Sequence, residues 1–218
     1  MESAIAAQNC GADRVELCAR LDLDGLTPSN ELILKTREAI DIWLHVIIRP
    51  SQGDFTVTNQ ELGQMIDSIA FCSENGIDGV VFGVLNDDGS MNQIATQKLI
   101  EAAGPMSITF HRAFDVCKEP KRLCRQLREL GIARILTSGQ AHEAIDGIDL
   151  ISELVQREPD IKIMAGSGVN ESNVLQFWNA GVRQFHFTSH RENELGMNEF
   201  DWEKTRMVIK KLKDVCGF

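Results

Sequence analysis

Short apolar runs alternate with amphipathic stretches along the chain, at a spacing of about thirty residues. The apolar runs are rich in β-branched residues and predict strands that are buried on both faces, and the stretches between them predict helices. Strands are expected at 13–18, 43–49, 79–85, 107–114, 134–137, 161–165 and 184–188. Helices are expected at 2–9, 27–40, 61–75, 92–103, 119–130, 150–157, 171–180 and 202–216, and a loop at 191–199.

This alternation predicts an α/β protein of the TIM (β/α)8-barrel type, formed by residues 1–218 as a single domain. Such a barrel has eight strands, each before its helix, whereas the sequence supplies seven strands for eight helices. The first helix begins next to Met1, with no strand before it. Either the chain is truncated or an open barrel is closed by another element, and an open edge would favour pairing with a second copy or with another strand.

Composition excludes several classes of function. The 218 residues carry a formal net charge of −10 and no basic stripe, which argues against a nucleic-acid partner. No apolar run approaches the roughly 20 residues that span a bilayer, and no signal peptide is apparent, so no membrane partner and a cytoplasmic location are expected. None of the six cysteines forms a CxxC pair, and Cys72, Cys124 and Cys216 are expected to be buried hydrophobes.

Ionisable residues gather at the ends of several predicted strands. Glu16, Arg49 and His111 occupy such positions, and Arg112 and Asp115 follow directly after His111. Strand ends meet at the top face of a barrel, so these five residues are candidate catalytic groups for acid/base chemistry on a small anionic or phosphorylated metabolite. The alternative is a buried ion pair between Glu16 and Arg49, with the histidines bonded to carbonyl groups.

Small residues form a second group at other strand ends. Ser138, Gly139, Gly166, Gly168 and Ser189 follow the later strands, where barrels of this type often bind phosphate through backbone N–H groups. These residues are candidate anion ligands. A tight turn between strand and helix explains the glycines equally well.

A metal site is the third alternative. Cys18, His111 and His186 are candidate ligands, with Glu16 nearby in the barrel, although no pair of them has a spacing diagnostic of a metal. Lys162 lies early in its strand, far from the top face, which argues against a Schiff-base aldolase.

Several segments resemble the CutC family of copper homeostasis proteins. The most specific are 109–115, Thr-Phe-His-Arg-Ala-Phe-Asp, and 134–139, Arg-Ile-Leu-Thr-Ser-Gly; further matches lie at 11–18, 27–29, 45–50, 53–55 and 78–83. The resemblance implies a cytosolic (β/α) barrel, a homodimer, and a link to copper handling without an agreed reaction.

The chain departs from that family pattern in ways that affect the copper hypothesis. The family begins with a strand that carries a cysteine, and this strand is missing here. Proposals for copper binding in the family pair that cysteine with the one that matches Cys18, so the chain supplies half of the pair. In addition, Ala165 and Ser167 stand where the family has proline and glycine. Two hypotheses result: a copper homeostasis protein that binds Cu(I) weakly near Cys18, and a barrel enzyme that acts on an anionic metabolite.

Overall fold

The computed structural model describes residues 1–192 and 198–216. Seven parallel strands form one curled sheet in which each strand pairs with the next along the chain. They are β1 (Arg14–Leu17), β2 (Trp43–Ile47), β3 (Gly79–Phe82), β4 (Ser107–Phe110), β5 (Arg134–Thr137), β6 (Lys162–Ala165) and β7 (Gln184–Phe185). The α/β barrel type with seven strands, predicted from the sequence, is therefore confirmed.

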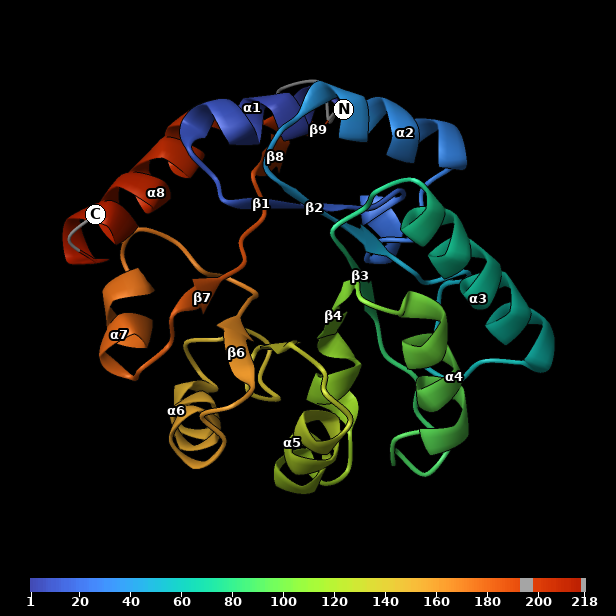
Figure 1. Ribbon diagram of the computed structural model, residues 1–218. Helices are drawn as coiled ribbons and strands as arrows, with labels where there is room; N and C mark the ends of the chain where they lie inside the picture. Colours follow the sequence, from blue (N-terminus) through green and yellow to red (C-terminus); the bar gives the residue numbers. More distant parts are fainter. Residues whose placement is uncertain (193–197, 217–218) are drawn as a thin grey trace.

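Helices surround the sheet on its outer side (Figure 1). They are α1 (Glu2–Cys10), α2 (Asn30–Ala39), α3 (Asn59–Glu74), α4 (Gln93–Ala103), α5 (Pro120–Glu129), α6 (Ile148–Arg157), α7 (Val174–Asn179) and α8 (Trp202–Cys216). The last helix, α8, packs against both α7 and α1, so the helical shell continues past the ends of the sheet. The described residues thus contain the eight helices that the sequence predicts.

The core lies between the sheet and these helices. Strands β3 and β5 are buried along their whole length, as expected for parallel strands covered on both faces. Phe82, Phe110, Phe114 and Phe177 are the bulkiest side chains that are fully buried. Cys72 and Cys124 are buried as predicted, whereas the side chain of Cys216 lies outside the described part of the chain.

Local signals explain where several helices begin. The Thr58 hydroxyl accepts a hydrogen bond from the Glu61 N–H, and the Glu61 carboxylate accepts one from the Thr58 N–H, which forms a capping box at the start of α3. The Asp201 carboxylate accepts the Lys204 N–H at the start of α8. Helix α7 begins at Val174, later than the predicted Glu171, because the Asn170 side chain accepts the Ser172 N–H and holds a turn before the helix.

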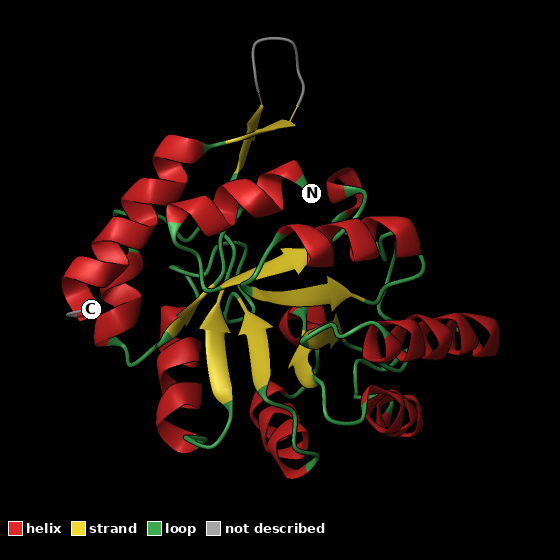
Figure 2. Ribbon diagram, turned by 45° about the horizontal axis from the view of Figure 1, so that its top comes forward, coloured by secondary structure: helices red, strands yellow, loops and turns green. Residues whose placement is uncertain are grey.

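Several sequence predictions are wrong in detail. The strand expected at 184–188 ends at Phe185, so His186 follows it, and the strand expected at 79–85 ends at Phe82. The strand expected at 107–114 ends at Phe110, and Arg112–Val116 forms a 3-10 helix, η2, because the His111 ring caps this turn. The loop expected at 191–199 is partly an antiparallel hairpin of β8 (His190–Glu192) and β9 (Asn198–Phe200), which projects from the body of the protein (Figure 2). A second 3-10 helix, η1 (Leu21–Leu23), follows β1.

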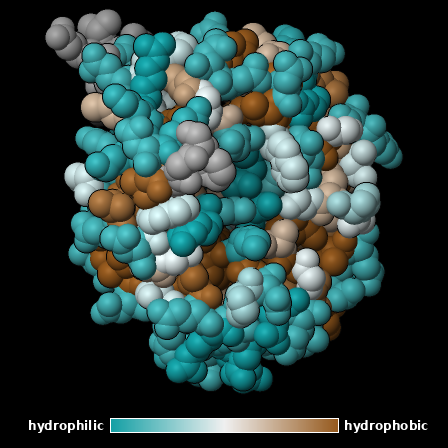
Figure 3. Space-filling model, turned by 60° about the vertical axis from the view of Figure 1, so that its left-hand side comes forward, coloured by the Kyte–Doolittle hydropathy of each residue, from teal (hydrophilic) through white to brown (hydrophobic). Residues whose placement is uncertain are grey.

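The outer surface near the chain ends is mixed in character. Figure 3 shows the side that lies to the left in Figure 1, where small apolar areas are interspersed with polar ones. Leu175, Trp202 and Met207, on α7 and α8, are among the exposed large hydrophobic residues. Scattered exposure of this kind is common on monomers, so the homodimer remains a prediction.

Of the helices in the described ranges, none is both long enough and apolar enough to span a membrane.

Candidate functional site

One large cavity runs through the barrel along its open side. Its volume is about 1600 Å³, above the range of roughly 300–1,000 Å³ that is usual for a small-molecule pocket. Its upper part, here called the mouth, is lined by Glu16, Cys18, Arg49, His111 and His186. The cavity also extends downward between β1 and β7, so it has room for more than one small ligand.

The mouth contains a carboxylate and an imidazole in close approach. The His186 Nδ1 atom lies 3.8 Å from the Glu16 Oε2 atom. Glu16 comes from β1 and His186 follows β7, so the pair lies across the two open edges of the sheet. The Glu16 side chain is 12 % exposed and that of His186 is 32 % exposed, so both are partly shielded but accessible to a ligand. Such a pair can accept a proton from a bound molecule and return it.

Arg49 brings a positive charge to the same mouth. Its guanidinium donates to the carbonyl oxygens of three loop residues, Leu23, Gly25 and Gly53, and lies 5.3 Å from the centroid of the Phe55 ring. Its Nε atom is buried and has no partner among the described residues. Within those residues Arg49 makes no ion pair with Glu16, so the alternative of a buried pair between them is not found. The positive charge of Arg49 is therefore available to attract an anionic ligand in the mouth.

His111 is held in one protonation state by its surroundings. Its Nδ1 atom accepts the Ala113 N–H at 3.2 Å, which places the ring proton on Nε2. Burial, followed by the positive charge of Arg49, lowers the pKa of His111 to about 3. The ring packs against Phe55 at a centroid distance of 4.9 Å. His111 is thus a neutral imidazole at physiological pH, suited to donating a hydrogen bond from Nε2.

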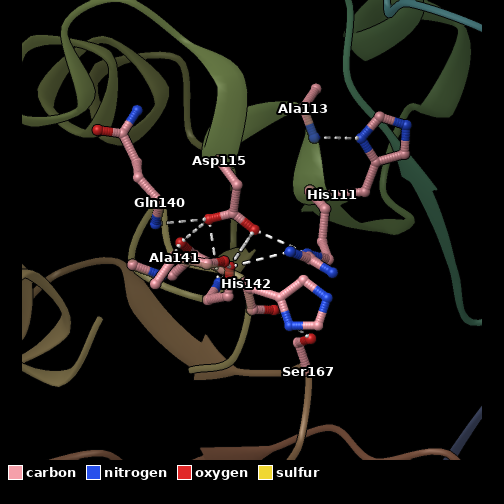
Figure 4. Close-up of polar contacts among 11 residues, drawn as sticks. His111, Ala113, Asp115, Gln140, Ala141, His142 and Ser167 are labelled. Carbon is pink, nitrogen blue, oxygen red and sulfur yellow. Dashed lines mark hydrogen bonds and ion pairs between the residues drawn. The ribbon is translucent and has the colours of Figure 1, made fainter. Parts of the chain in front are cut away.

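Asp115 organises the loop that follows β5 (Figure 4). Its carboxylate accepts the Ser138 N–H at 3.0 Å, the Gln140 N–H at 3.2 Å and the Arg112 Nε–H at 2.8 Å. It also accepts the hydroxyl groups of Thr137 and Ser138. Only 6 % of the Asp115 side chain is exposed. Asp115 therefore acts within the described chain as an internal anion that fixes this loop and Arg112.

The small residues proposed as anion ligands divide into two groups. Gly168 and Ser189 line the cavity. The N–H groups of Ser138 and Gly139 already donate within the chain, to Asp115 and to the Thr137 hydroxyl respectively. A Cβ atom on Gly139 would lie 2.2 Å from the Gly147 oxygen, so close packing of two loops explains this glycine.

The glycines after β6 also have packing explanations. A Cβ atom on Gly166 would lie 2.4 Å from Leu136 Cδ1, so this glycine makes room for a core leucine. The position of a Gly168 Cβ lies 3.1 Å from the Glu143 carboxylate, which would repel an anion bound there. Ser167 between them adopts a left-handed backbone with φ 83°, and its hydroxyl donates to the His142 carbonyl at 2.8 Å. An anion in the mouth is better placed near Arg49 than near these glycines.

The residues proposed as metal ligands do not form a prepared site. Cys18 and His186 both line the mouth, but the Nδ1 atom of His111 is already occupied by the Ala113 N–H. Burial, followed by the negative charge of Glu16, raises the pKa of the Cys18 thiol to about 11, so the thiolate that binds a metal is disfavoured. The described residues contain no group of three or more His, Cys, Asp or Glu side chains arranged to hold a metal ion. These donors do not fit a preformed copper centre.

Sequence reasoning missed two arginines that lie inside the barrel beneath the mouth. Arg14 donates to Gln184 Oε1 at 3.4 Å, and Arg134 donates to the same oxygen at 3.1 Å. Side chains from β1, β5 and β7 can meet in this way only within the barrel. The alternation of side chains along β1 could have predicted that Arg14 points into the barrel, because Arg14 lies two residues before Glu16 and on the same face of the strand.

The fold and the cavity place the chain among TIM-barrel-like α/β proteins with an open side. A family model described as the CutC family matches residues 1–191. A protein named CutC from Klebsiella pneumoniae strain 342 is 46% identical over 186 residues, which cover 85% of this chain and 75% of that protein. The chain therefore belongs to the CutC family.

Solved structures agree with this assignment. CutC of Streptococcus agalactiae, whose name links it to copper homeostasis, matches with a TM-score of 0.76 and 34% identity, covering 81% of this chain and 88% of that chain. A thiamine phosphate pyrophosphorylase of Pyrococcus furiosus matches with a TM-score of 0.63 at 15% identity, over 98% of this chain and 89% of that chain. At that identity the second likeness shows the shared fold alone.

Proposed function

We propose that the mouth binds a small anionic metabolite and moves a proton on it. The observation that carries the proposal is the 3.8 Å approach of His186 Nδ1 to Glu16 Oε2 inside a cavity that Arg49 also lines. Glu16 takes a proton from a carbon atom of the bound molecule, and the electron pair of the broken C–H bond moves to an adjacent oxygen of that molecule. His186 relays the proton, which then returns to a carbon atom of the same molecule. The reaction class is proton abstraction and return, which needs no oxidant or second substrate.

The remaining residues of the mouth have supporting roles in this proposal. Arg49 attracts the anionic group, because its charge has no carboxylate partner among the described ion pairs. His111 donates from Nε2 to an oxygen of the bound molecule, as a neutral imidazole can. Arg112 and Asp115 shape the wall of the mouth, since their ion pair at 2.8 Å holds both side chains in place.

A screen followed by an exchange measurement tests this proposal. Phosphorylated and carboxylated metabolites of three to six carbons would be ranked by the rise they cause in melting temperature. Hits would then be incubated with the protein in D2O and followed by proton NMR. We expect the wild type to exchange one carbon-bound proton of a hit for deuterium, and Glu16→Gln to lose this exchange while still binding. Equal exchange in wild type and Glu16→Gln would refute the role of Glu16, and the absence of any anionic hit would refute the site.

Arg49→Lys provides a second test of the same proposal. Lysine keeps the positive charge but not the three donations to loop carbonyls, so binding of a hit is expected to weaken. Lys35→Met, on the outer face of α2, is the matched control and should bind the hit like the wild type. An affinity that is the same for Arg49→Lys and Lys35→Met would argue against anion binding at Arg49.

Weak binding of Cu(I) at Cys18 is a second candidate function. It is supported by the position of Cys18 in the mouth, which His186 also lines, and by the copper homeostasis name of the Streptococcus agalactiae relative. The described cysteines are free, which suits a reducing cytoplasm as the location for either function. Titration with Cu(I) against a competing chelator tests this candidate, with Cys18→Ser as the comparison. Equal copper uptake by both proteins would exclude Cys18 as the ligand.

A further inference from the structure

Arg112 lines the cavity with one edge of its guanidinium group free. It lies in η2, directly after β4, and 43% of its side chain is exposed. Its Nε–H donates to Asp115 at 2.8 Å, and its Nη2 donates to the Ser138 hydroxyl at 2.9 Å. These two donors form one edge of the planar group, and the other edge, formed by Nη1 and Nη2, has no acceptor among the described residues. Two parallel N–H donors of this kind match the two oxygens of a carboxylate.

Asp115 holds Arg112 in place and leaves that edge free. Only 6% of the Asp115 side chain is exposed, so a ligand in the cavity reaches the guanidinium more readily than the carboxylate. Neutral groups also stabilise the negative charge of Asp115: the Thr137 hydroxyl, the N–H and hydroxyl of Ser138 and the Gln140 N–H. The Arg112 cation is therefore presented to the cavity in a fixed orientation, which lowers the entropy cost of binding an anion.

Arg49 is a second cation on the same side of the mouth. Arg49 follows β2 and Arg112 follows β4, with β3 between these two strands in the sheet. Neighbouring strands lie about 4.8 Å apart, so the strands that carry the two arginines are about 10 Å apart. Arg49 makes no ion pair within the described chain, and its Nε atom is buried without a partner there. Two cations therefore stand at the ends of one stretch of the mouth.

The His111 ring lies along this stretch, over the end of β3. A Cβ atom on Gly83, which follows β3, would lie 2.7 Å from His111 Nδ1, so this glycine makes room for the ring. The His111 ring and the Arg49 guanidinium pack against the same Phe55 ring, at 4.9 and 5.3 Å from its centroid. His111 lines the cavity, and its Nε2–H has no acceptor among the described residues. A molecule that extends from Arg49 to Arg112 therefore passes this donor.

We propose that the mouth binds a short dicarboxylate, with one carboxylate at Arg49 and the other on the free edge of Arg112. Each arginine carries one positive charge, which matches a singly charged carboxylate better than a phosphate group with a charge near −2. The carbon atoms between the two acid groups then lie beside His111, which donates to the oxygen they carry. This substrate class rests on the function proposed for the same mouth. Arg112 is the residue that selects molecules with two acid groups over those with one.

Straight-chain dicarboxylates and their monoamides test the proposal directly. The probes are malonate, succinate, glutarate and adipate, and each control has one carboxylate replaced by a carboxamide of nearly the same size. Isothermal titration calorimetry at constant ionic strength is expected to show at least one dicarboxylate binding about tenfold or more tighter than its monoamide. Equal affinities within every pair would overturn the second carboxylate site and leave the single-anion function intact. If no probe of either kind binds, the dicarboxylate class is wrong, and the wider metabolite screen decides the anion site by itself.

Arg112→Gln tests whether this residue holds the second carboxylate. Glutamine removes the cation, so the preference for the dicarboxylate should fall to about twofold or less, while the affinity for the monoamide stays within about threefold. Arg122→Gln is the matched control and should keep the preference, because Arg122 also pairs with an acid three residues away, Glu119, but lies 64% exposed on α5. A preference that survives in Arg112→Gln would overturn the assignment to Arg112. The comparison of the two ligand series on the wild type decides the proposal even if Arg112→Gln fails to fold.

Discussion

Replacement of Asp115 provides the strongest test of how the loop after β5 is held. The Asp115 carboxylate accepts five donors, from Arg112, Thr137, Ser138 and Gln140, while being almost buried. Asp115→Asn keeps the size of the side chain and one accepting oxygen, but turns an amide N–H₂ toward the Arg112 guanidinium. Asp115→Ala removes every acceptor and leaves the Ser138 N–H, in a fully buried residue, without a partner.

The expected magnitudes follow from these contacts. A hydrogen bond to a charged group contributes about 1.5–3 kcal/mol, and the Arg112 side chain is 43% exposed, so the asparagine variant should lose about 2 kcal/mol. The alanine variant adds a buried unsatisfied N–H, worth about 1–3 kcal/mol, and should lose about 4 kcal/mol in total. For a chain of 218 residues, the asparagine loss corresponds to a fall in melting temperature of about 4–8 °C.

Urea unfolding, followed by far-UV circular dichroism, measures both losses. Asp22→Asn is the matched control, because Asp22 also forms an ion pair with an arginine, Arg20, at 2.7 Å, but both side chains are 59% exposed. Its unfolding midpoint should equal that of the wild type. A midpoint for Asp115→Asn indistinguishable from the control, or an alanine variant no less stable than the asparagine variant, would refute the assigned role of Asp115.

Further predictions concern pH, packing and backbone strain. Burial lowers the pKa of His45 to about 3, so below about pH 6.5 the unfolded chain binds more protons than the folded chain, and the free energy of unfolding falls as the pH drops toward 3. His45→Phe should reduce the slope of the free energy of unfolding against pH by up to about 1.4 kcal/mol per pH unit. His142→Phe, at an exposed position, should leave that slope unchanged. Gly63→Ala, in open space within α3, should raise stability by about 1 kcal/mol in urea unfolding, whereas Gly139→Ala, whose Cβ meets backbone at 2.2 Å, should lower it by more than about 3 kcal/mol; the reverse order would contradict the packing. Ser167→Gly should leave stability within about 1 kcal/mol of wild type, since relief of the φ 83° backbone offsets the lost hydroxyl bond, and Ser167→Ala should be the less stable of the two by thermal unfolding.

The sequence was sufficient to predict the seven strands of the main sheet and the eight α-helices, because each of these elements carries its own signal. Apolar runs and helix caps such as Thr58 and Asp201 depend on neighbours within a few residues. The end of the strand at Phe110 was not predictable in this way. Phe114 continues the apolar pattern beyond it, and the end depends on His111 bonding the Ala113 N–H.

Only the part of the site that lies on or next to strands could be predicted, from the alternation of side chains along those strands. Glu16 and His186 were expected to lie near each other in the barrel, with His186 as a candidate metal ligand, and the structure places His186 Nδ1 3.8 Å from Glu16 Oε2. The partners of Asp115 could not be predicted, because they lie 22 to 25 residues away on another loop, apart from Arg112. The contacts of Arg49 with loop carbonyls could not be predicted either, since they depend on the path of irregular backbone.

The contact between α1 and α8 has a consequence for how the protein opens. Strand pairing joins neighbours in sequence, but this helix contact closes a loop of about 190 residues and carries the corresponding entropy cost. Helix α1 buries little to offset that cost, since its buried residues are Ala4 and Ala6. The seam between the two helices should therefore separate while β3, β4 and β5 stay folded. Hydrogen exchange should then report faster exchange of α1 amides than of amides in those central strands.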